Sequence, residues 1–329
     1  MAFLRFLESI RTGVGDFFFS AITYLGDEIF FLVIAILFFW CINKREGYYI
    51  LVTGVIGSVI NQWLKVLCRV PRPWHIDSTF TTVGNSQARA GGYSFPSGHT
   101  QNVAGTFGCI GRFNKQKWVK ILSVVIIVLV SFSRMYLGVH TPLDVGVSLV
   151  IAAALVFAFH FVFATEERAK KYMTFVVIGS VIFSIAFVIC AFLLPEASYA
   201  TPEDFENLMS ARENAATLTG CLLGLFLVYP LDKYYIKFET EARWYSQAIK
   251  FIIGVGVNLL IKEGLEIPLN MLFGNDYVGR IARYFLIVAF SGAVWPLTFK
   301  YFKNLKIERM ERFTEWVVGK FRKVDTPAD

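Results

Sequence analysis

The chain has 329 residues, of which 55% are hydrophobic and only 17% are charged, and its mean hydropathy is +0.54. This composition excludes a soluble globular domain, because the apolar residues come in blocks long enough to span a bilayer. The net charge of +7 does not indicate nucleic-acid binding, since the basic residues cluster in short loops between apolar blocks and act there as a topology signal.

Residues 1–20 carry apolar side chains at helical spacing. Leu4, Leu7 and Ile10 recur on one face, with Arg5 and Glu8 between them. The pattern predicts an amphipathic helix that lies in the interface plane of a membrane. A leader that packs on the rest of the protein is an equal alternative. The N-terminal residues do not show the basic region, apolar core and small-residue cleavage site of a cleavable signal peptide.

Nine apolar blocks follow and predict an all-α fold, a polytopic transmembrane helix bundle of about nine spans. The blocks lie at about 27–43, 48–65, 98–112, 119–138, 143–164, 172–194, 214–231, 247–264 and 281–299. The block from Gly98 is the shortest and most polar, so we expect other helices to bury it. We divide the chain into the interfacial helix (1–20), a core bundle (21–195) and additional transmembrane helices with a basic tail (196–329).

The basic loops predict the orientation in the membrane. With nine spans, most of them and the tail fall on one side, which the positive-inside rule assigns to the cytoplasm. We therefore expect a plasma or inner membrane protein with its N-terminus outside and its C-terminus inside. The loop between the second and third blocks is an exception, because it lies outside yet contains Lys65, Arg69, Arg72 and Arg89. Anion binding would explain these cations.

The first motif is Lys65 followed, after six residues, by Arg72-Pro73. An ammonium and a planar guanidinium both suit phosphate oxygens. For Lys65 alone, snorkelling to the lipid headgroups is an equally good interpretation.

The second motif is Pro96-Ser97-Gly98-His99, which opens the third block. Ser97 can cap a helix whose N-terminus attracts anions, and Gly98 leaves the backbone open to a ligand. His99 can exchange a proton near neutral pH. An ordinary turn would use the same residues.

The third motif is Ser133-Arg134, then His140 after five residues, then Asp144 after three. His140 and Asp144 have the spacing and chemistry of a nucleophile and the carboxylate that orients it. Asp144 also fits a helix start, with Thr141 as the cap and Pro142 in the first turn. The two interpretations are compatible.

Together the three motifs resemble the signature of the type 2 phosphatidic acid phosphatases, with every fixed position present at the family's internal spacings. The resemblance covers about residues 60–165, and nothing after about 195 matches a motif. The order of the spans is similar to that of the sphingosine-phosphate phosphatase and glucose-6-phosphatase branches.

The resemblance implies a role for each site residue. His140 attacks phosphorus and forms a phospho-histidine, Asp144 orients it, and His99 protonates the leaving alcohol and then activates water. The phosphate oxygens would be held by Lys65, Arg72, Ser97, Gly98 and Arg134. We expect no cofactor and no metal, because three cations supply the charge and no Cys/His cluster has ligand spacing. The five cysteines predict no disulfide framework.

The predicted function is an integral membrane phosphatase that hydrolyses a phosphomonoester or diphosphate of a lipid. Its partners would be the lipid phosphate and the bilayer, without nucleic acid. One alternative is a sugar-phosphate phosphatase of the glucose-6-phosphatase type. Another is a phosphotransferase that moves the phosphate to a lipid or headgroup acceptor. A non-catalytic anion transporter would require one of the catalytic residues to be missing, and all are present.

Residues 74–95 are expected to form part of the site's mouth. Aromatic residues there can contact a lipid chain or anchor the protein at the interface, and they are Trp74, Phe80, Tyr93 and Phe95. Asp27 and Glu28 can edge the site, although helix capping is the stronger interpretation. His75 can assist binding, and we interpret His160 as structural.

Overall fold

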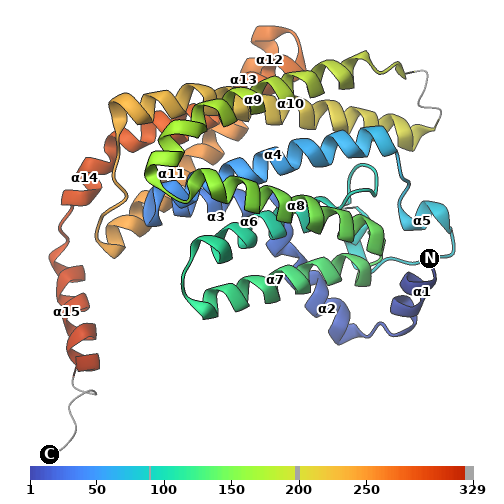
Figure 1. Cartoon of the computed structure of the whole chain (residues 1–329), viewed down its shortest axis with the longest axis horizontal. Coiled ribbons are helices and arrows are strands. Elements are labelled where there is room, and N and C mark those ends of the chain that lie inside the picture. The colour runs from blue at the N-terminus through green and yellow to red at the C-terminus, as the bar shows by residue number, and fades with distance from the viewer. Residues whose placement is uncertain (89, 197–200, 323–329) are drawn as a thin grey trace, which may run out of the picture.

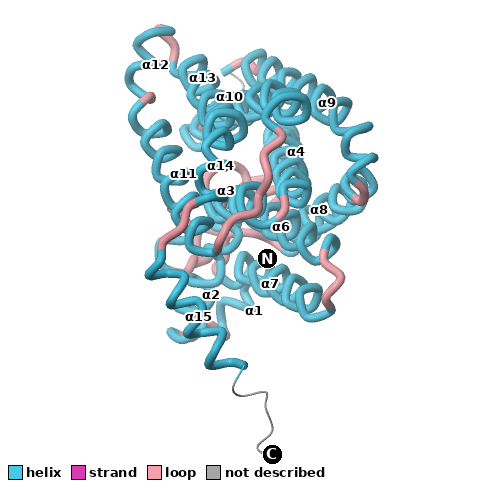
Figure 2. Tube along the Cα trace, turned by 90° about the vertical axis from the view of Figure 1, so that its left-hand side faces the viewer, coloured by secondary structure: helices cyan, strands magenta, loops and turns pink. Residues whose placement is uncertain are grey.

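The structure is a computed structural model that describes residues 1–88, 90–196 and 201–322, and within these ranges it contains helices and loops but no strand (Figure 2). Arg89 and the last seven residues of the basic tail lie outside the described residues. The α-helices are α1 (Ala2–Ser9), α2 (Gly13–Ile22), α3 (Glu28–Leu37), α4 (Lys44–Cys68), α5 (Pro73–Ile76), α6 (Gly98–Phe113), α7 (Lys117–Tyr136), α8 (Pro142–Phe163), α9 (Glu166–Leu193), α10 (Pro202–Leu231), α11 (Trp244–Gly264), α12 (Glu266–Phe273), α13 (Asp276–Ala289), α14 (Phe299–Asn304) and α15 (Glu308–Arg322).

The chain is an integral membrane protein with an all-α, polytopic bundle, as predicted. Seven helices in the described ranges are long and apolar enough to cross a membrane, and the bent pair formed by α2 and α3 can supply an eighth crossing. The third predicted block became α6, whose 16 residues are too few for a membrane-spanning helix of the usual length.

Helix α6 lies in the middle of the bundle and contacts α3, α4, α7 and α8 (Figure 1). Its polar side chains Thr100, Gln101 and Thr106 are buried, which confirms that neighbouring helices cover this block. Helix α4 packs on α6 and α8 and also on α9 and α10. The C-terminal helices α10 and α13 are therefore joined to the motif-bearing helices through α4.

The N-terminal segment forms two helices instead of the single one predicted over 1–20. The chain breaks at Ile10–Thr12, and the Thr12 side chain caps α2 by accepting a hydrogen bond from the Gly15 amide. Leu4 and Leu7 of α1 are almost fully buried, so this face packs on the protein. The alternative of a leader that packs on the bundle is therefore the better description of α1.

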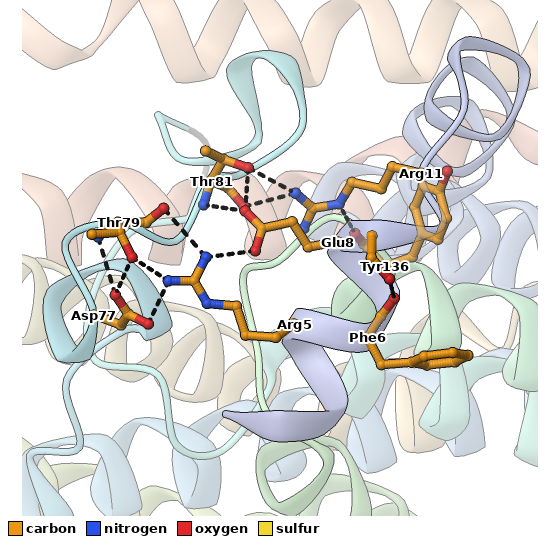
Figure 3. Close-up of polar contacts among 9 residues, drawn as sticks. Arg5, Phe6, Glu8, Arg11, Asp77, Thr79, Thr81 and Tyr136 are labelled. Atoms are coloured by element: carbon orange, nitrogen blue, oxygen red, sulfur yellow. Dashed lines mark hydrogen bonds and ion pairs between the residues drawn. The ribbon is translucent and has the colours of Figure 1, made fainter.

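Polar contacts fasten α1 to the loop between α5 and α6 (Figure 3). Arg5 pairs with Asp77 at 2.5 Å, and a Glu8 carboxylate oxygen accepts a hydrogen bond from the Thr81 amide at 2.8 Å. Arg11 donates to the carbonyl oxygens of Thr81 and Tyr136, at 2.8 and 3.0 Å. The N-terminus thereby fixes the loop next to the three motifs.

Large apolar side chains fill the interior of the bundle. Trp40 and Tyr49 are fully buried, and the Tyr49 hydroxyl donates to the Val156 carbonyl at 2.6 Å. Gly54 in α4 allows the Phe31 ring to approach closely, because a Cβ at Gly54 would lie 2.2 Å from that ring. This packing holds α3, α4 and α8 in register around the site.

Candidate active site

The three motifs meet at one end of the bundle, where α4 and α7 end and where α6 and α8 begin. They surround a cavity of about 220 Å³. Among the residues predicted to act on phosphate, those that line the cavity are Lys65, Arg72, Gly98, His99, Arg134 and His140. Ser97 and Asp144 are buried behind this lining. The structure therefore assembles the predicted set from segments far apart in the sequence.

The Arg72 guanidinium defines the protonation of the His140 ring. Arg72 Nη1 lies 3.0 Å from His140 Nε2 and 3.4 Å from Nδ1. Because a guanidinium can only donate hydrogen bonds, the nearer Nε2 acts as the acceptor and carries the lone pair. The proton then belongs on Nδ1. This tautomer leaves a lone pair on Nε2, which lies next to the Arg72 guanidinium.

Asp144 lies on the other side of the His140 ring, with its Oδ2 3.5 Å from Nδ1. This is an ion-pair distance and is longer than a typical hydrogen bond. The same oxygen accepts hydrogen bonds from the Ser94 hydroxyl at 2.6 Å and from the Thr141 amide at 2.7 Å. Thr141 and Asp144 form a capping box with Pro142 in the first turn, so the predicted helix start is confirmed.

Backbone carbonyls hold the two cations of the first motif. Arg72 donates from Nε to Gly92 at 3.0 Å, from Nη2 to Gly91 at 2.8 Å and from Nη1 to Val139 at 2.9 Å. The Lys65 ammonium donates to the Tyr93 carbonyl. These contacts tie the loop before α6 to α4 and aim both cations at the cavity.

The other residues that the sequence predicts to bind phosphate lie at the ends of helices. Arg134 donates from Nη1 to the Thr23 hydroxyl at 2.7 Å, and its buried Nε has no hydrogen-bond partner among the described residues. The Ser97 side chain caps α6 by accepting from the Thr100 amide at 3.4 Å. Gly98 is the first residue of α6, so its backbone N–H is not used within the helix. An anion in the cavity would provide partners for these donors.

His99 has a partner that sequence reasoning missed. Its Nε2 lies 2.6 Å from Asp27 Oδ1. Asp27 is the N-cap residue of α3, as expected, but its side chain makes no capping hydrogen bond to the helix and pairs with His99. His99 and Asp27 also line a neighbouring cavity of about 210 Å³, which places His99 between the two cavities. Burial, and then the charge of Arg134, lower the pKa of the His99 imidazole to about 4, although the Asp27 carboxylate acts in the opposite direction. His99 is therefore neutral near pH 7 in the free site, and the negative charge of a bound phosphate would favour its protonation.

The environment of His140 favours its neutral form. Burial, and then the nearby charges of Arg72, Arg134 and Lys65, hold the pKa of the His140 imidazole well below its ordinary value of 6.5. His140 is only 2% exposed. The ring is therefore unprotonated near neutral pH, as a nucleophile requires.

The loop aromatics do not take the position expected of a lipid-binding mouth, since none of the four lines the described cavity. Phe80 is buried next to Arg5 and Arg11. The Tyr93 hydroxyl donates to Asp204 of α10 at 2.9 Å. These two rings instead fix the loop to its neighbours.

The other two histidines lie apart from His99 and His140. His75 Nδ1 lies 3.0 Å from Glu203 Oε2 and links α5 to α10. His160 stands beside Tyr49 in the core, with its Nδ1 unpartnered among the described residues. All five cysteines are free thiols.

Further polar residues of the cavity come from segments without a motif. Ser94 holds Asp144, while Glu28, Asn61 and Gln101 line the cavity. In the sequence these residues were noticeable only as polar residues at the ends of apolar blocks. Polarity alone does not show which residue each of them contacts. Within the described ranges, no group of three or more His, Cys, Asp or Glu residues has a metal-binding arrangement.

Comparison with protein families gives two matches. The model of the PAP2 superfamily matches residues 46–168. The model described as the transmembrane extension of PAP2 superfamily phosphatases matches residues 216–307. No solved structure matches the chain.

Three curated relatives illustrate the similarity. A probable sphingosine-1-phosphate phosphatase of Dictyostelium discoideum is 28% identical over 165 residues, which cover 46% of this chain and 39% of that protein. An undecaprenyl-diphosphatase of Sulfolobus acidocaldarius is 31% identical, over 37% of this chain and 57% of that protein. Sphingosine-1-phosphate phosphatase 2 of Mus musculus is 24% identical, over 76% of this chain and 72% of that protein. The chain thus spans less than two thirds of the first two relatives.

Proposed function

Because the chain belongs to the PAP2 superfamily, we propose that it is a membrane phosphatase that hydrolyses a phosphomonoester or diphosphate of a lipid. The observation that carries the proposal is the position of His140, whose Nε2 faces Arg72 in a cavity shared with His99. The names of the relatives, which include sphingosine-1-phosphate and undecaprenyl-diphosphate phosphatases, support a lipid substrate.

The reaction begins when the substrate phosphate replaces His140 as the partner of Arg72. His140 Nε2 then attacks phosphorus in line with the leaving oxygen, and Asp144 stabilises the positive charge that develops on the ring. In a monophosphate the P–O bond to the lipid breaks, and His99 gives its proton to the departing alkoxide; in a diphosphate the P–O bond between the two phosphorus atoms breaks, and the lipid monophosphate leaves. The products of this step are the alcohol or the lipid monophosphate, and a phospho-histidine.

The second step reverses the role of His99. Now neutral, it removes a proton from a water molecule, and the oxygen of that water attacks phosphorus. The P–N bond breaks, inorganic phosphate leaves, and His140 returns to its starting tautomer. Throughout, the charge on the phosphate oxygens is stabilised by Lys65, Arg72, Arg134 and the amides at the start of α6. No metal or cofactor enters these steps.

The location follows from the charge pattern. Most basic loops lie at the end of the bundle opposite the site, and the positive-inside rule assigns them to the cytoplasm. The active site then faces the extracytoplasmic side of a plasma or inner membrane, and the C-terminus is cytoplasmic.

Ser97, which caps α6, contributes to phosphate binding because it fixes the backbone amides that face the phosphate.

Phosphate release from purified protein in detergent micelles tests the function. A panel of long-chain lipid monophosphates, a prenyl diphosphate and glucose 6-phosphate should give inorganic phosphate from the lipids, and His140→Ala should give none. Release from glucose 6-phosphate alone would favour the sugar-phosphate alternative. Loss of substrate without free phosphate, but with a phosphorylated acceptor, would favour phosphotransfer. Equal release by a folded His140→Ala protein would overturn the proposal.

A further inference from the structure

Four consecutive residues in front of the second motif hold three groups of the candidate site. This segment, residues 91–94, is here called the strap. Its first two carbonyl oxygens accept hydrogen bonds from Arg72, at 2.8 and 3.0 Å, and its third accepts one from the Lys65 ammonium. Its last residue, Ser94, donates to the Asp144 carboxylate at 2.6 Å. The position of the strap therefore sets the positions of two cations and of the carboxylate next to His140.

The strap belongs to no helix or strand, so regular secondary structure does not fix its position. Gly92 has a φ of +70°, in the left-handed region that favours glycine. The Ser94 amide donates to the Val70 carbonyl at 2.9 Å, which ties one end of the strap to the segment before Arg72. The remainder of the strap depends on contacts made by its side chains.

Helix α10 provides such a contact. The Tyr93 hydroxyl donates to Asp204 Oδ1 at 2.9 Å, and Tyr93 is only 4% exposed. Asp204 lies in the first turn of α10, where its own amide donates to the Thr201 side chain at 3.1 Å. A hydrogen bond to a carboxylate is roughly twice as strong as one between neutral groups. Tyr93 thus connects the strap firmly to the start of α10.

The residue before Asp204 contacts the chain on the other side of Arg72. Glu203 Oε2 lies 3.0 Å from His75 Nδ1, and His75 belongs to α5, which begins directly after Arg72. The start of α10 lies at the same end of the bundle as α5 (Figure 1). Two consecutive carboxylates of α10 therefore contact both segments that determine where the Arg72 guanidinium lies.

Close packing fixes α10 among the C-terminal helices. It packs against α13, α9 and α4. Gly220 and Gly224 allow α13 to approach, because a Cβ at Gly220 would lie 2.4 Å from the Ile281 carbonyl oxygen and one at Gly224 would lie 2.7 Å from Val288. A helix held in this way can transmit the arrangement of the C-terminal helices to the strap.

The contact also lies outside the part of the chain that carries the motifs. Asp204 falls between the family match at 46–168 and the match at 216–307, whereas Tyr93 and the residues held by the strap lie inside the first match. The hydrogen bond thus joins the phosphate-binding segments to helices that contribute no motif residue.

We propose that Tyr93 and Asp204 are positioning residues, through which the first turn of α10 holds the strap and thereby sets the affinity of Lys65 and Arg72 for phosphate. The C-terminal helices then control phosphate binding although neither positioning residue touches the phosphate. This inference rests on the proposed function, because it takes Lys65 and Arg72 to be the residues that bind the phosphate.

Equilibrium binding of inorganic phosphate to the purified protein tests the proposal. Tyr93→Phe and Asp204→Ala each remove the hydrogen bond, and each should raise the Kd for phosphate at least about fivefold, because a bond to a charged group is lost. The KM for a lipid phosphate should rise by a similar factor. The double variant should be no weaker than the weaker single variant, since both changes remove the same contact. A purely structural role would lower the amount of folded protein and leave Kd and KM unchanged.

A conservative variant and two controls complete the experiment. Asp204→Glu keeps a carboxylate and should recover part of the affinity. Glu206→Ala removes an exposed carboxylate of the same helix, and Tyr235→Phe removes a hydroxyl from a tyrosine that is 79% exposed. Both controls should keep the Kd of the wild type.

Two results would overturn the positioning role. One is a wild-type Kd for phosphate in folded Tyr93→Phe and Asp204→Ala proteins, and the other is a double variant whose Kd rises by the product of the two single effects. A wild-type protein that binds phosphate but releases none from any lipid phosphate would instead overturn the phosphatase function.

Discussion

His99 Nε2 and Asp27 Oδ1 are 2.6 Å apart, although 72 positions separate the two residues in the chain. The pair connects the junction before α3 with the start of α6. In the proposed reaction His99 protonates the leaving alcohol, so Asp27 is a positioning residue that holds the acid towards the substrate. In this reaction the departure of the leaving group depends on the contact between Asp27 and His99.

Asp27→Asn should therefore lower kcat on an alkyl phosphate about 10- to 100-fold, a part of the usual contribution of a general acid. A nitrophenyl phosphate, whose leaving group departs without a proton, should lose much less. Asp276→Asn, the same change at the first turn of α13, should affect neither substrate. An equal loss on both substrates in Asp27→Asn would assign Asp27 a structural role only.

The low pKa of His140 predicts a pH dependence. Burial and the neighbouring cations lower it from 6.5, so protonation should inactivate the nucleophile only in more acidic solution. Lys65→Met removes one of these cations, and the His140 pKa should rise. The acid limb of kcat/KM should then move to higher pH than in the wild type, measured with the same substrate so that phosphate titration cancels. An unchanged or more acidic limb would contradict the electrostatic account.

The hydrogen bond from Ser94 to Asp144 can be tested by mutation. Its hydroxyl donates to Asp144 Oδ2 at 2.6 Å, and Ser94 is fully buried. Ser94→Ala should reduce the free energy of unfolding by about 1–3 kcal/mol, because a buried carboxylate loses a donor. It should also lower kcat. Ser184→Ala, a buried serine of α9, should change stability without a specific loss of kcat. A Ser94→Ala protein with normal kcat would show that Asp144 needs no such support.

The N-terminal contacts in Figure 3 predict protection of the loop between α5 and α6. Arg11→Met removes the hydrogen bonds to the Thr81 and Tyr136 carbonyls. Proteolysis within 77–83 should become faster, as local opening costs less free energy. Arg309→Met in α15 should leave the cleavage rate unchanged. If both variants were cleaved like the wild type, the contacts of Arg11 would not protect the loop.

Chelation tests the expected independence from metals. Three cations line the cavity, and the described residues hold no cluster suited to a metal ion. Phosphate release should therefore persist after dialysis against EDTA. A loss that is restored by added Mg²⁺ or Mn²⁺ would show that the cations do not suffice.

The sequence predicted the motif residues well because their spacing is tied to local structure. Ser97 and Thr141 each cap a helix, so the residues that follow them, including His99 and Asp144, have fixed directions. Residue type and spacing were enough to predict that these residues would lie together around one cavity. The all-α membrane bundle followed in the same way from the length of the apolar blocks.

Contacts between distant segments could not be predicted in this way. The pairing of Asp27 with His99 depends on how α3 packs against α6, and capping was an equally natural use of Asp27. The approach of α10 to the cavity depends on its packing against α4, which no motif records. The expectation of one continuous helix over 1–20 was wrong because Thr12 starts a new helix.

The central claim is that His140 becomes phosphorylated during turnover. The direct measurement is a rapid quench in alkali, where phospho-histidine survives, after mixing the protein with a lipid phosphate labelled in its phosphate group. We predict label on the peptide that contains His140, none in His140→Ala, and loss of label as inorganic phosphate appears. Label on a different residue, or phosphate release by His140→Ala without a labelled protein, would contradict the account.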